Sequence, residues 1–141
     1  MPPAPQAPTP NRPLARINVL VVEDHADSRD YLDEALTQYG AAVIAVESAT
    51  RAMEIVAKVT PTVIVADVAM PQHDGLWLLR ELRQHQQSAG PYVPVIALTA
   101  SVRRPMRADF DAVLIKPCPI DALCQVILRL TRGIEAKMER A

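Results

Sequence analysis

The chain has 141 residues, half of which are hydrophobic and 22% charged, and its formal net charge is −1. This composition is typical of a globular protein, and the balanced charge argues against a broad surface for nucleic acid or an anionic membrane. No apolar run approaches the roughly 18 residues of a membrane-spanning helix, and the amino terminus lacks the apolar core of a signal peptide. The two cysteines show neither metal-ligand spacing nor a disulfide framework, so we expect a reducing, cytoplasmic location.

The first segment, residues 1–16, contains six prolines and almost no bulky apolar residues. Proline lacks the backbone N–H that helices and sheets use for hydrogen bonds. The few apolar residues of this segment bury too little area to offset the entropy lost on ordering it, and we therefore predict a disordered tail. A ligand for a proline-binding partner is the less favoured interpretation. Residues 17–133 are long enough for one domain with a single core, and residues 134–141 are predicted to be a polar extension.

Short continuous apolar runs rich in valine and isoleucine follow the tail. They do not alternate with polar residues, which is typical of parallel strands covered on both faces. The runs are 19–22, 43–46, 63–66, 95–98 and 112–115. Segments with helical periodicity lie between them, including one with Leu32, Leu36 and Tyr39 that stops at Gly40, and one capped by Ser48. This alternation predicts an α/β fold with a parallel sheet and right-handed crossovers.

Polar residues close four of these runs: Glu23 and Asp24, then Asp67, Thr99 and Lys116. In open α/β sheets, ligands bind beyond the carboxyl ends of the strands, near the point where the strand order reverses. If the strand order is 2-1-3-4-5, the first and third strands are neighbours. The three carboxylates then share one pocket, and the threonine and the lysine flank it.

Three carboxylates held close together raise one another's pKa unless a cation intervenes. Mg²⁺ suits such a site best, because it binds through one or two carboxylates and keeps positions for water and phosphate oxygens. A lysine opposite supplies a charge for a phosphoryl group, and a threonine hydroxyl can donate a hydrogen bond to it. An aspartate nucleophile is a known route to an acyl phosphate, so the pattern favours phosphoryl transfer.

Four segments, VLVVEDH, IVADVAMPQHDG, VIALTAS and IKP, resemble the signature blocks of response-regulator receiver domains. They occur in the order of that family and span the chain from about Arg16 to Gly133. The resemblance implies a flavodoxin-like, doubly wound, five-stranded parallel sheet of order 2-1-3-4-5 with helices on both faces. It also implies a phosphoacceptor protein of two-component (phosphorelay) signal transduction.

The resemblance assigns roles to the residues at the strand ends. Asp67 is the phosphoacceptor and a metal ligand, and Asp24 ligates Mg²⁺ directly. Glu23 acts mostly through a metal-bound water, and the backbone carbonyl of Ala69 is a further ligand. Thr99 is the switch hydroxyl, and Lys116 pairs with the phosphoryl group. The peptide bond between Lys116 and Pro117 is expected to be cis.

The partners implied are a histidine kinase or a phosphotransfer protein, and a downstream protein reached by direct contact. We expect a monomer or a weak homodimer that turns over no external substrate. Alternatives are the receiver of a hybrid histidine kinase and a degenerate receiver that serves as a phosphorylation-independent scaffold. A phosphohydrolase is disfavoured because Ala69 stands where those enzymes carry a second aspartate. A flavodoxin is disfavoured because the chain lacks a glycine-rich phosphate loop.

Each of these residues also has a structural interpretation. Asp24 is a candidate helix N-cap, in competition with Asp27 and Ser28. Asp67 is a candidate acceptor for loop amides, and Lys116 a candidate solvated strand end. Gly75, in the turn, is expected to have unusual backbone dihedrals. Trp77, the single tryptophan, is expected to be a packing residue. The three histidines are interpreted as loop or surface residues: His25, His73 and His85.

Two features depart from the family pattern. The position three residues before the lysine, usually aromatic, is Val113, which removes the ring that normally moves with the switch hydroxyl. The stretch between Thr99 and Lys116 is short by more than one helical turn and contains Pro105 among three arginines. We therefore predict that the fourth helix is short or missing, and that output uses another face or responds weakly to phosphorylation.

Overall fold

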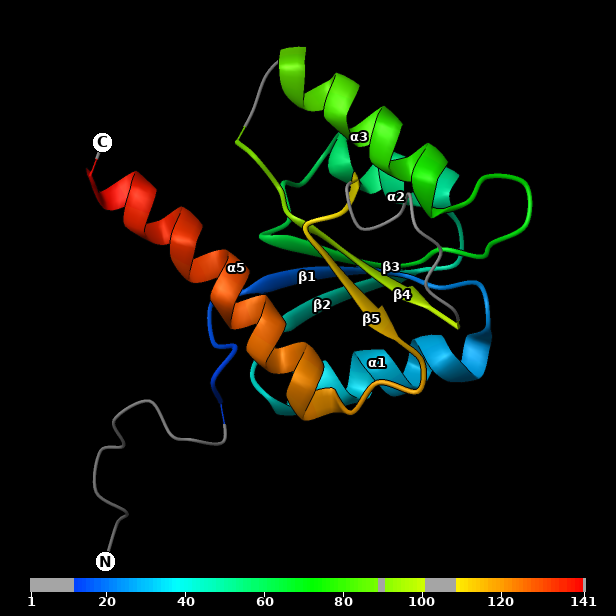
Figure 1. The fold of residues 1–141 in the computed structure, drawn as a ribbon, viewed down its shortest axis with the longest axis horizontal. Helices are drawn as coiled ribbons and strands as arrows, with labels where there is room; N and C mark the ends of the chain where they lie inside the picture. The colour runs from blue at the N-terminus through cyan, green and yellow to red at the C-terminus, as the bar shows by residue number, and fades with distance from the viewer. Residues whose placement is uncertain (1–11, 89–90, 101–108, 141) are drawn as a thin grey trace, which may run out of the picture.

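The structure is a computed structural model that describes residues 12–88, 91–100 and 109–140 (Figure 1). Strands and helices alternate along most of the chain, as the apolar runs predict. In chain order the elements are β1 (Asn18–Val22), α1 (Ala26–Gln38), β2 (Ala42–Val46), α2 (Ala49–Val56), β3 (Val63–Asp67), α3 (Gly75–Ser88), β4 (Val95–Thr99), β5 (Ala112–Ile115) and α5 (Ile120–Arg140). None of the described helices is long and apolar enough to cross a membrane.

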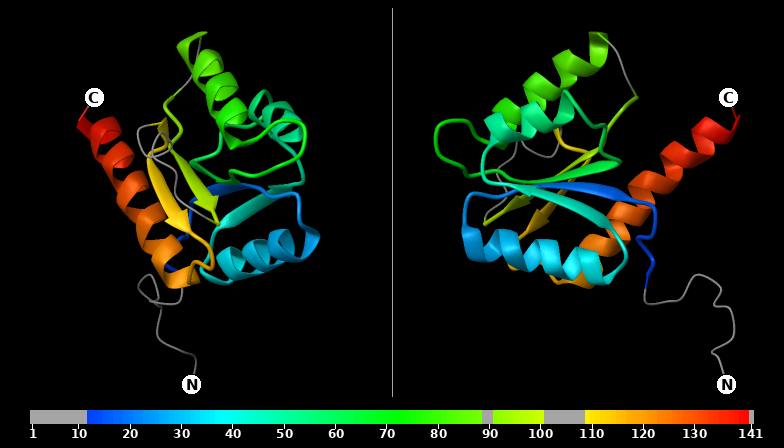
Figure 2. Two further views of the ribbon diagram at one scale, coloured as in Figure 1. Left: turned by 45° about the vertical axis from the view of Figure 1, so that its right-hand side comes forward. Right: turned by 180° about the vertical axis from the view of Figure 1, so that it is seen from behind.

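The five strands form one parallel sheet in the order β2-β1-β3-β4-β5. Helices α1 and α5 cover one face, and α2 and α3 cover the other, as the two views of Figure 2 show. Each face of the sheet therefore has its own hydrophobic layer. The predicted flavodoxin-like fold and strand order are confirmed, and β1 and β3 are neighbours.

Burial explains why the strands are continuously apolar. Every residue of β3 and β4 is buried, because both strands lie inside the sheet with helices on both sides. The side chains of β3 alternate between the two hydrophobic layers, so no position faces water. The edge strands β2 and β5 are more exposed; Ile44 on β2 and Ile115 on β5 are 41% and 52% exposed. The central strands thus hold their carboxyl ends rigidly in place.

The helix ends follow the predicted capping signals in two places. Ser48 is the N-cap of α2, where its hydroxyl accepts a hydrogen bond from the backbone N–H of Arg51 at 3.1 Å. Gly40 follows α1 with a φ of 102°, which an L side chain rarely adopts. The N-cap of α1 is His25, and no side chain caps this helix. The interpretation of Asp24 as the cap of this helix is therefore wrong.

The packed unit begins a few residues before the apolar run of β1. Leu14, which the sequence places in the proline-rich tail, is fully buried in the hydrophobic layer on the α1 and α5 side of the sheet, and its N–H donates to the carbonyl of Tyr39. Helix α5 runs on to Arg140 and so includes most of the segment 134–141. The tail before residue 12 and the expected short or missing fourth helix, in 101–108, lie outside the described residues.

A polar network joins α3 to the amino-terminal ends of β4 and β5. Asp111, just before β5, accepts hydrogen bonds from the guanidinium of Arg83, from the hydroxyl of Tyr92 and from the N–H of Val95. The guanidinium of Arg83 also lies 4.3 Å from the centre of the Tyr92 ring, a cation–π contact. Burial and the hydrogen bond to Asp111 raise the pKa of Tyr92 to about 12.

Candidate functional site

The polar residues that close the strands meet at one edge of the sheet. Glu23 and Asp24 follow β1, Asp67 ends β3, Thr99 ends β4, and Lys116 follows β5. One carboxylate oxygen from each of the three acidic residues lies within 4.8 Å of the other two. Thr99 is buried at the end of β4, and its carbonyl accepts a hydrogen bond from the N–H of Lys116 at 2.7 Å. The structure thus brings the three predicted carboxylates and Lys116 together, and it places Thr99 at the end of β4, between β3 and β5.

Asp67 is buried, and it accepts a hydrogen bond from a loop amide, as its structural interpretation predicts, but it also pairs with Lys116. Its side chain is only 6% exposed, and its two oxygens have different partners. Oδ1 lies 3.3 Å from the backbone N–H of Ala69, which donates to it, and Oδ2 lies 3.3 Å from Nζ of Lys116. One loop amide and one ammonium group therefore orient this carboxylate. The carbonyl of Ala69 remains a predicted ligand.

Lys116 is paired with two carboxylates and is not a free strand end. Its Nζ lies 3.0 Å from Oε1 of Glu23 and 3.3 Å from Oδ2 of Asp67. Burial opposes the charged form of the amine, but the hydrogen bond with Glu23 and the charges of both carboxylates outweigh it and raise the pKa of Lys116. The side chain therefore stays cationic. The peptide bond that follows, Lys116–Pro117, is cis, as predicted.

Glu23 is the most deeply buried acid of the group, with a side chain 1% exposed. Burial and the neighbouring Asp67 raise its pKa, and Lys116 offsets only part of this. Its Oε2 and Oδ1 of Asp24 are buried and have no hydrogen-bond partner among the described residues. Buried carboxylate oxygens without a donor are costly unless a cation is bound. These residues therefore fit a hard divalent cation with oxygen ligands, such as Mg²⁺.

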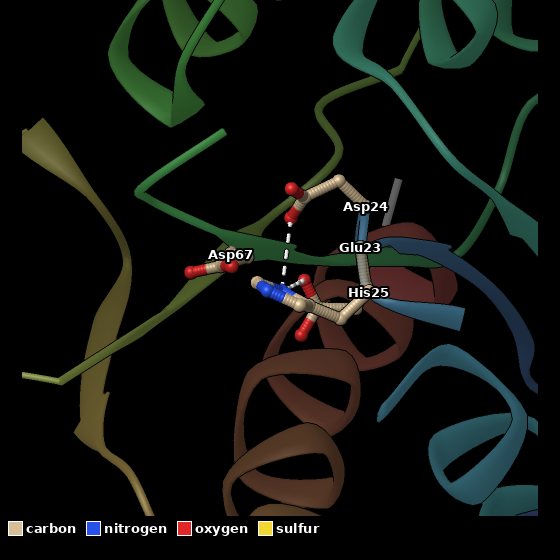
Figure 3. A group of neighbouring side chains, drawn as sticks. All are labelled: Glu23, Asp24, His25 and Asp67. Carbon is tan, nitrogen blue, oxygen red and sulfur yellow. Dashed lines mark ion pairs between the residues drawn. The ribbon is translucent and has the colours of Figure 1, made fainter. Parts of the chain in front are cut away.

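Two residues of this site were not predicted. His25, interpreted from the sequence as a loop or surface residue, is indeed exposed, but its Nδ1 lies 3.4 Å from Oδ1 of Asp24 and 3.9 Å from Oε2 of Glu23 (Figure 3). Arg29 donates through Nη1 to the backbone carbonyls of Glu23 at 3.0 Å and Asp24 at 3.4 Å. In the sequence, the place of His25 directly after the acidic pair and that of Arg29 one helical turn later are the features that could have indicated these two residues.

The loop from β3 to α3 folds tightly against the acceptor. The N–H of Gly75 donates to the carbonyl of Val68 at 3.0 Å, and Oδ1 of Asp74 caps the helix by accepting from the N–H of Trp77 at 2.9 Å. The prediction of unusual dihedrals for Gly75 is wrong, because its φ is not positive. A Cβ at this position would lie 3.1 Å from Cα of Val68 and 3.2 Å from the carbonyl oxygen of Asp67. Close backbone approach therefore requires the glycine.

Trp77 packs partly buried against the hydrophobic layer under α2 and α3, as predicted for a packing residue. Its indole ring also stacks on the imidazole of His73, with ring centroids 3.9 Å apart and planes 15° from parallel. The loop that follows Asp67 is thus held to the first turn of α3 by the contact between His73 and Trp77.

Val113 occupies the place at which the family pattern has an aromatic ring. It pairs with Ala97 of β4 and packs, partly buried, on the same hydrophobic layer as α2 and α3. Two residues later, Ile115 pairs with Thr99 and is half exposed. The edge of the sheet next to the site is therefore aliphatic, with no ring on the described part of β5.

Comparison with known proteins identifies receiver domains as similar in sequence and in fold. The family model of the response regulator receiver domain matches residues 19–128. A 14.6 kDa protein in the sodA1 3′ region of Leptolyngbya boryana is 37% identical over 109 residues, which cover 74% of this chain and 82% of that protein. The receiver domain of the histidine kinase CKI1 from Arabidopsis thaliana, solved with Mg²⁺ and BeF₃⁻, is 27% identical, with a TM-score of 0.73 over 83% of this chain and 91% of that chain.

Other relatives are longer proteins that share only this unit. The Regulator of RpoS from Escherichia coli is 30% identical over 111 residues, which cover 75% of this chain but 32% of that protein. The chain thus spans about a third of that relative's length. This chain belongs to the response regulator receiver domain family, whose members serve two-component signalling.

Proposed function

We propose that this protein accepts a phosphoryl group on Asp67 in a Mg²⁺-dependent reaction and signals by contact with another protein. The observation that carries the proposal is the pairing of a buried Asp67 with Lys116 beside carboxylate oxygens that lack hydrogen-bond donors. The receiver domain of CKI1 supports it, because that protein was solved with Mg²⁺ and BeF₃⁻. Glu23, Asp24, Asp67 and the carbonyl of Ala69 are the residues that would hold the ion.

In the reaction that we propose, a carboxylate oxygen of Asp67 attacks the phosphorus atom of a phosphohistidine. The new O–P bond forms as the N–P bond to the donor imidazole breaks, and the imidazole leaves with the electron pair of that bond. When bound, Mg²⁺ neutralises the charge of the transferred oxygens. Lys116 neutralises charge from the opposite side, and the hydroxyl of Thr99 donates a hydrogen bond to the phosphoryl group.

The donor that we propose is a histidine kinase or a phosphotransfer protein, and the output is a contact with a downstream protein. The bound phosphoryl group is later lost to water, so the protein turns over no external substrate. The similarity to the CKI1 receiver favours a second possibility, in which this unit is the receiver of a hybrid kinase. Val113 favours a third, a scaffold that acts without phosphorylation, because the ring that normally accompanies switching is replaced.

Intact-protein mass spectrometry after incubation with a small phosphodonor tests the proposal. We expect one phosphoryl adduct on the wild-type protein with Mg²⁺, and none with chelator or in Asp67→Asn. Asp30→Asn, which changes an exposed aspartate of α1, is the matched control and keeps the adduct. A folded wild-type protein that gives no adduct, either with the small donor or with a phosphorylated kinase, contradicts the proposal and favours the scaffold.

A further inference from the structure

His25 adds an imidazole nitrogen to the cluster of carboxylates. It is the last residue before α1, and its backbone is extended, with φ −78° and ψ 119°. Figure 3 shows its ring between the carboxylates of Asp24 and Glu23, near Asp67. One ligand atom from each of these four residues lies within 4.8 Å of all the others. The group is therefore mixed, with oxygen and nitrogen atoms facing one space.

The spacing fits atoms that share an ion better than atoms that bind one another. Nδ1 of His25 is 3.4 Å from Oδ1 of Asp24 and 3.9 Å from Oε2 of Glu23. Ligands held about 2.1 Å from one ion lie roughly 3.0 Å apart when adjacent and roughly 4.2 Å apart when opposite. Both distances fall in this interval, and both exceed those of a good charge-assisted hydrogen bond.

The two carboxylate oxygens that face the imidazole are the same two that lack a partner. Oε2 of Glu23 and Oδ1 of Asp24 are buried and make no hydrogen bond within the described residues. The side chain of Glu23 is 1% exposed, so water does not readily satisfy it. This is an independent sign of a ligand at this point, because an unpaired buried carboxylate oxygen is costly in the absence of a cation.

The loop is held so that these groups stay together. Nη1 of Arg29 donates to the carbonyls of Glu23 and Asp24, and the N–H of Arg29 donates to the carbonyl of His25 at 2.9 Å. One residue of α1 thus fixes three successive carbonyls. The His25 side chain is 73% exposed, so its ring can turn toward an ion with little loss of packing.

We propose that His25 is a nitrogen ligand that extends the metal preference of this site from Mg²⁺ to the borderline transition ions Mn²⁺, Co²⁺, Ni²⁺ and Zn²⁺. The inference rests on the proposed function, since the same site holds the ion. Mg²⁺ prefers oxygen ligands and gains little from an imidazole, whereas the transition ions bind imidazole well. His25 thus raises the affinity of the site for transition ions relative to its affinity for Mg²⁺.

Isothermal titration with Ni²⁺ and with Mg²⁺ tests the selectivity, at about pH 8, where a free imidazole is neutral. We expect His25→Ala to weaken Ni²⁺ binding by about tenfold or more, since even residues that only support a ligand contribute that much. Mg²⁺ affinity should stay within about twofold. His85→Ala, which removes an exposed histidine of α3, is the matched control and should change neither.

Pulsed electron paramagnetic resonance of the Mn²⁺-loaded protein tests the bond itself. We expect the hyperfine signal of a directly coordinated ¹⁴N in the wild type and in His85→Ala, and its loss in His25→Ala. A loaded wild type without the nitrogen signal, or an unchanged Ni²⁺-to-Mg²⁺ affinity ratio in His25→Ala, overturns the inference. Both readouts are independent of phosphorylation. An adduct on Asp67 without the nitrogen signal rejects only the role of His25, whereas the nitrogen signal without an adduct rejects only the proposed function.

Discussion

Nζ of Lys116 lies 3.3 Å from Oδ2 of Asp67, although a whole strand separates the strands to which the two residues belong. Lys116 follows β5 and Asp67 ends β3, so the lysine side chain reaches past the end of β4. The contact depends on the order and the parallel direction of three strands. It places a positive charge where the carboxylate cluster would otherwise be uncompensated.

Replacing Lys116 should raise the affinity for Mg²⁺ but lower the rate at which Asp67 is phosphorylated. In Lys116→Met, we expect Mg²⁺ affinity to rise roughly fivefold, about 1 kcal/mol, because a competing cation is removed from the carboxylates. The rate of phosphorylation should fall about 10²-fold, because the transferred charge loses one of its stabilising groups. Titration calorimetry and the time course of the mass adduct measure the two effects. Unchanged Mg²⁺ affinity would show that the amine does not compete with the ion.

Glu23 should make the metal-free protein less stable as it ionises. Because its pKa is raised above 4.5 in the folded state, the folded protein binds more protons than the unfolded chain between 4.5 and the folded value. The free energy of unfolding should therefore fall as pH rises through that window. We expect Glu23→Gln to be more stable than the wild type at pH 7 without metal, by about 1 kcal/mol.

Urea unfolding with and without Mg²⁺ checks the effect of Glu23→Gln. Saturating Mg²⁺ should stabilise the wild type more than the variant, because the variant has lost a carboxylate that favours the ion. Glu34→Gln, at an exposed position of α1, is the matched control. A Glu23→Gln protein that is less stable than the wild type in chelator would mean that the bond with Lys116 outweighs the burial of Glu23.

Gly75→Ala should disturb the acceptor through the backbone. The added Cβ would lie 3.1 Å from Cα of Val68 and 3.2 Å from the carbonyl of Asp67, and neither atom belongs to a flexible side chain. We expect a loss of about 1–3 kcal/mol in stability, with weaker Mg²⁺ binding as the end of β3 shifts. Gly40→Ala is the control: its φ of 102° predicts lower stability, but it lies at the opposite end of the sheet. Equal Mg²⁺ affinity in both variants would contradict the expectation.

Tyr92→Phe should show how the network at the other end of the sheet depends on pH. The variant loses the hydrogen bond to Asp111, which we expect to cost about 0.5 kcal/mol at neutral pH because the ring is half exposed. Since the pKa of Tyr92 is raised from 10.0 to about 12, its contribution to stability is present below pH 10 and is lost as pH rises through about 12. The two proteins should therefore converge in alkali.

Urea unfolding at about pH 7, 9 and 11 measures this convergence. Lys116 also has a raised pKa and loses its proton in the alkaline range, but it does so in both proteins and cancels in the difference. Tyr31→Phe, on the exposed side of α1, is the control for loss of a phenol. A stability difference that stays constant from pH 7 to 11 would contradict the role assigned to Tyr92.

The fold and the principal site residues could be predicted because both depend on short-range patterns. Continuous valine and isoleucine runs are typical of strands covered on both faces, and the residue that ends each run falls at the ligand-binding edge of a parallel sheet. Asp67, Thr99 and Lys116 come together for this reason. Glu23 and Asp24 follow β1, which is the neighbour of β3, and they therefore lie close to Asp67.

The remaining features depend on contacts that a single sequence does not show. The spacing between the histidines does not indicate a ligand at His25, but its neighbours in the structure are carboxylates. The turn motif predicts unusual dihedrals for Gly75, but its absent Cβ instead leaves room for the backbone of Val68, and this close approach exists only in the folded protein. Leu14 lies near several prolines in the sequence, and only its burial in the hydrophobic layer of α1 and α5 shows that it belongs to the core.

The stacking of His73 on Trp77 means that the fluorescence of Trp77 depends on the position of the imidazole ring. The chain has a single tryptophan, so all of its indole emission comes from Trp77, in the first turn of the helix that follows the Asp67 loop. A change that separates the two rings alters the surroundings of the only fluorophore of its kind, without any attached dye. The tryptophan emission of the unmodified chain therefore reports on the contact between His73 and Trp77.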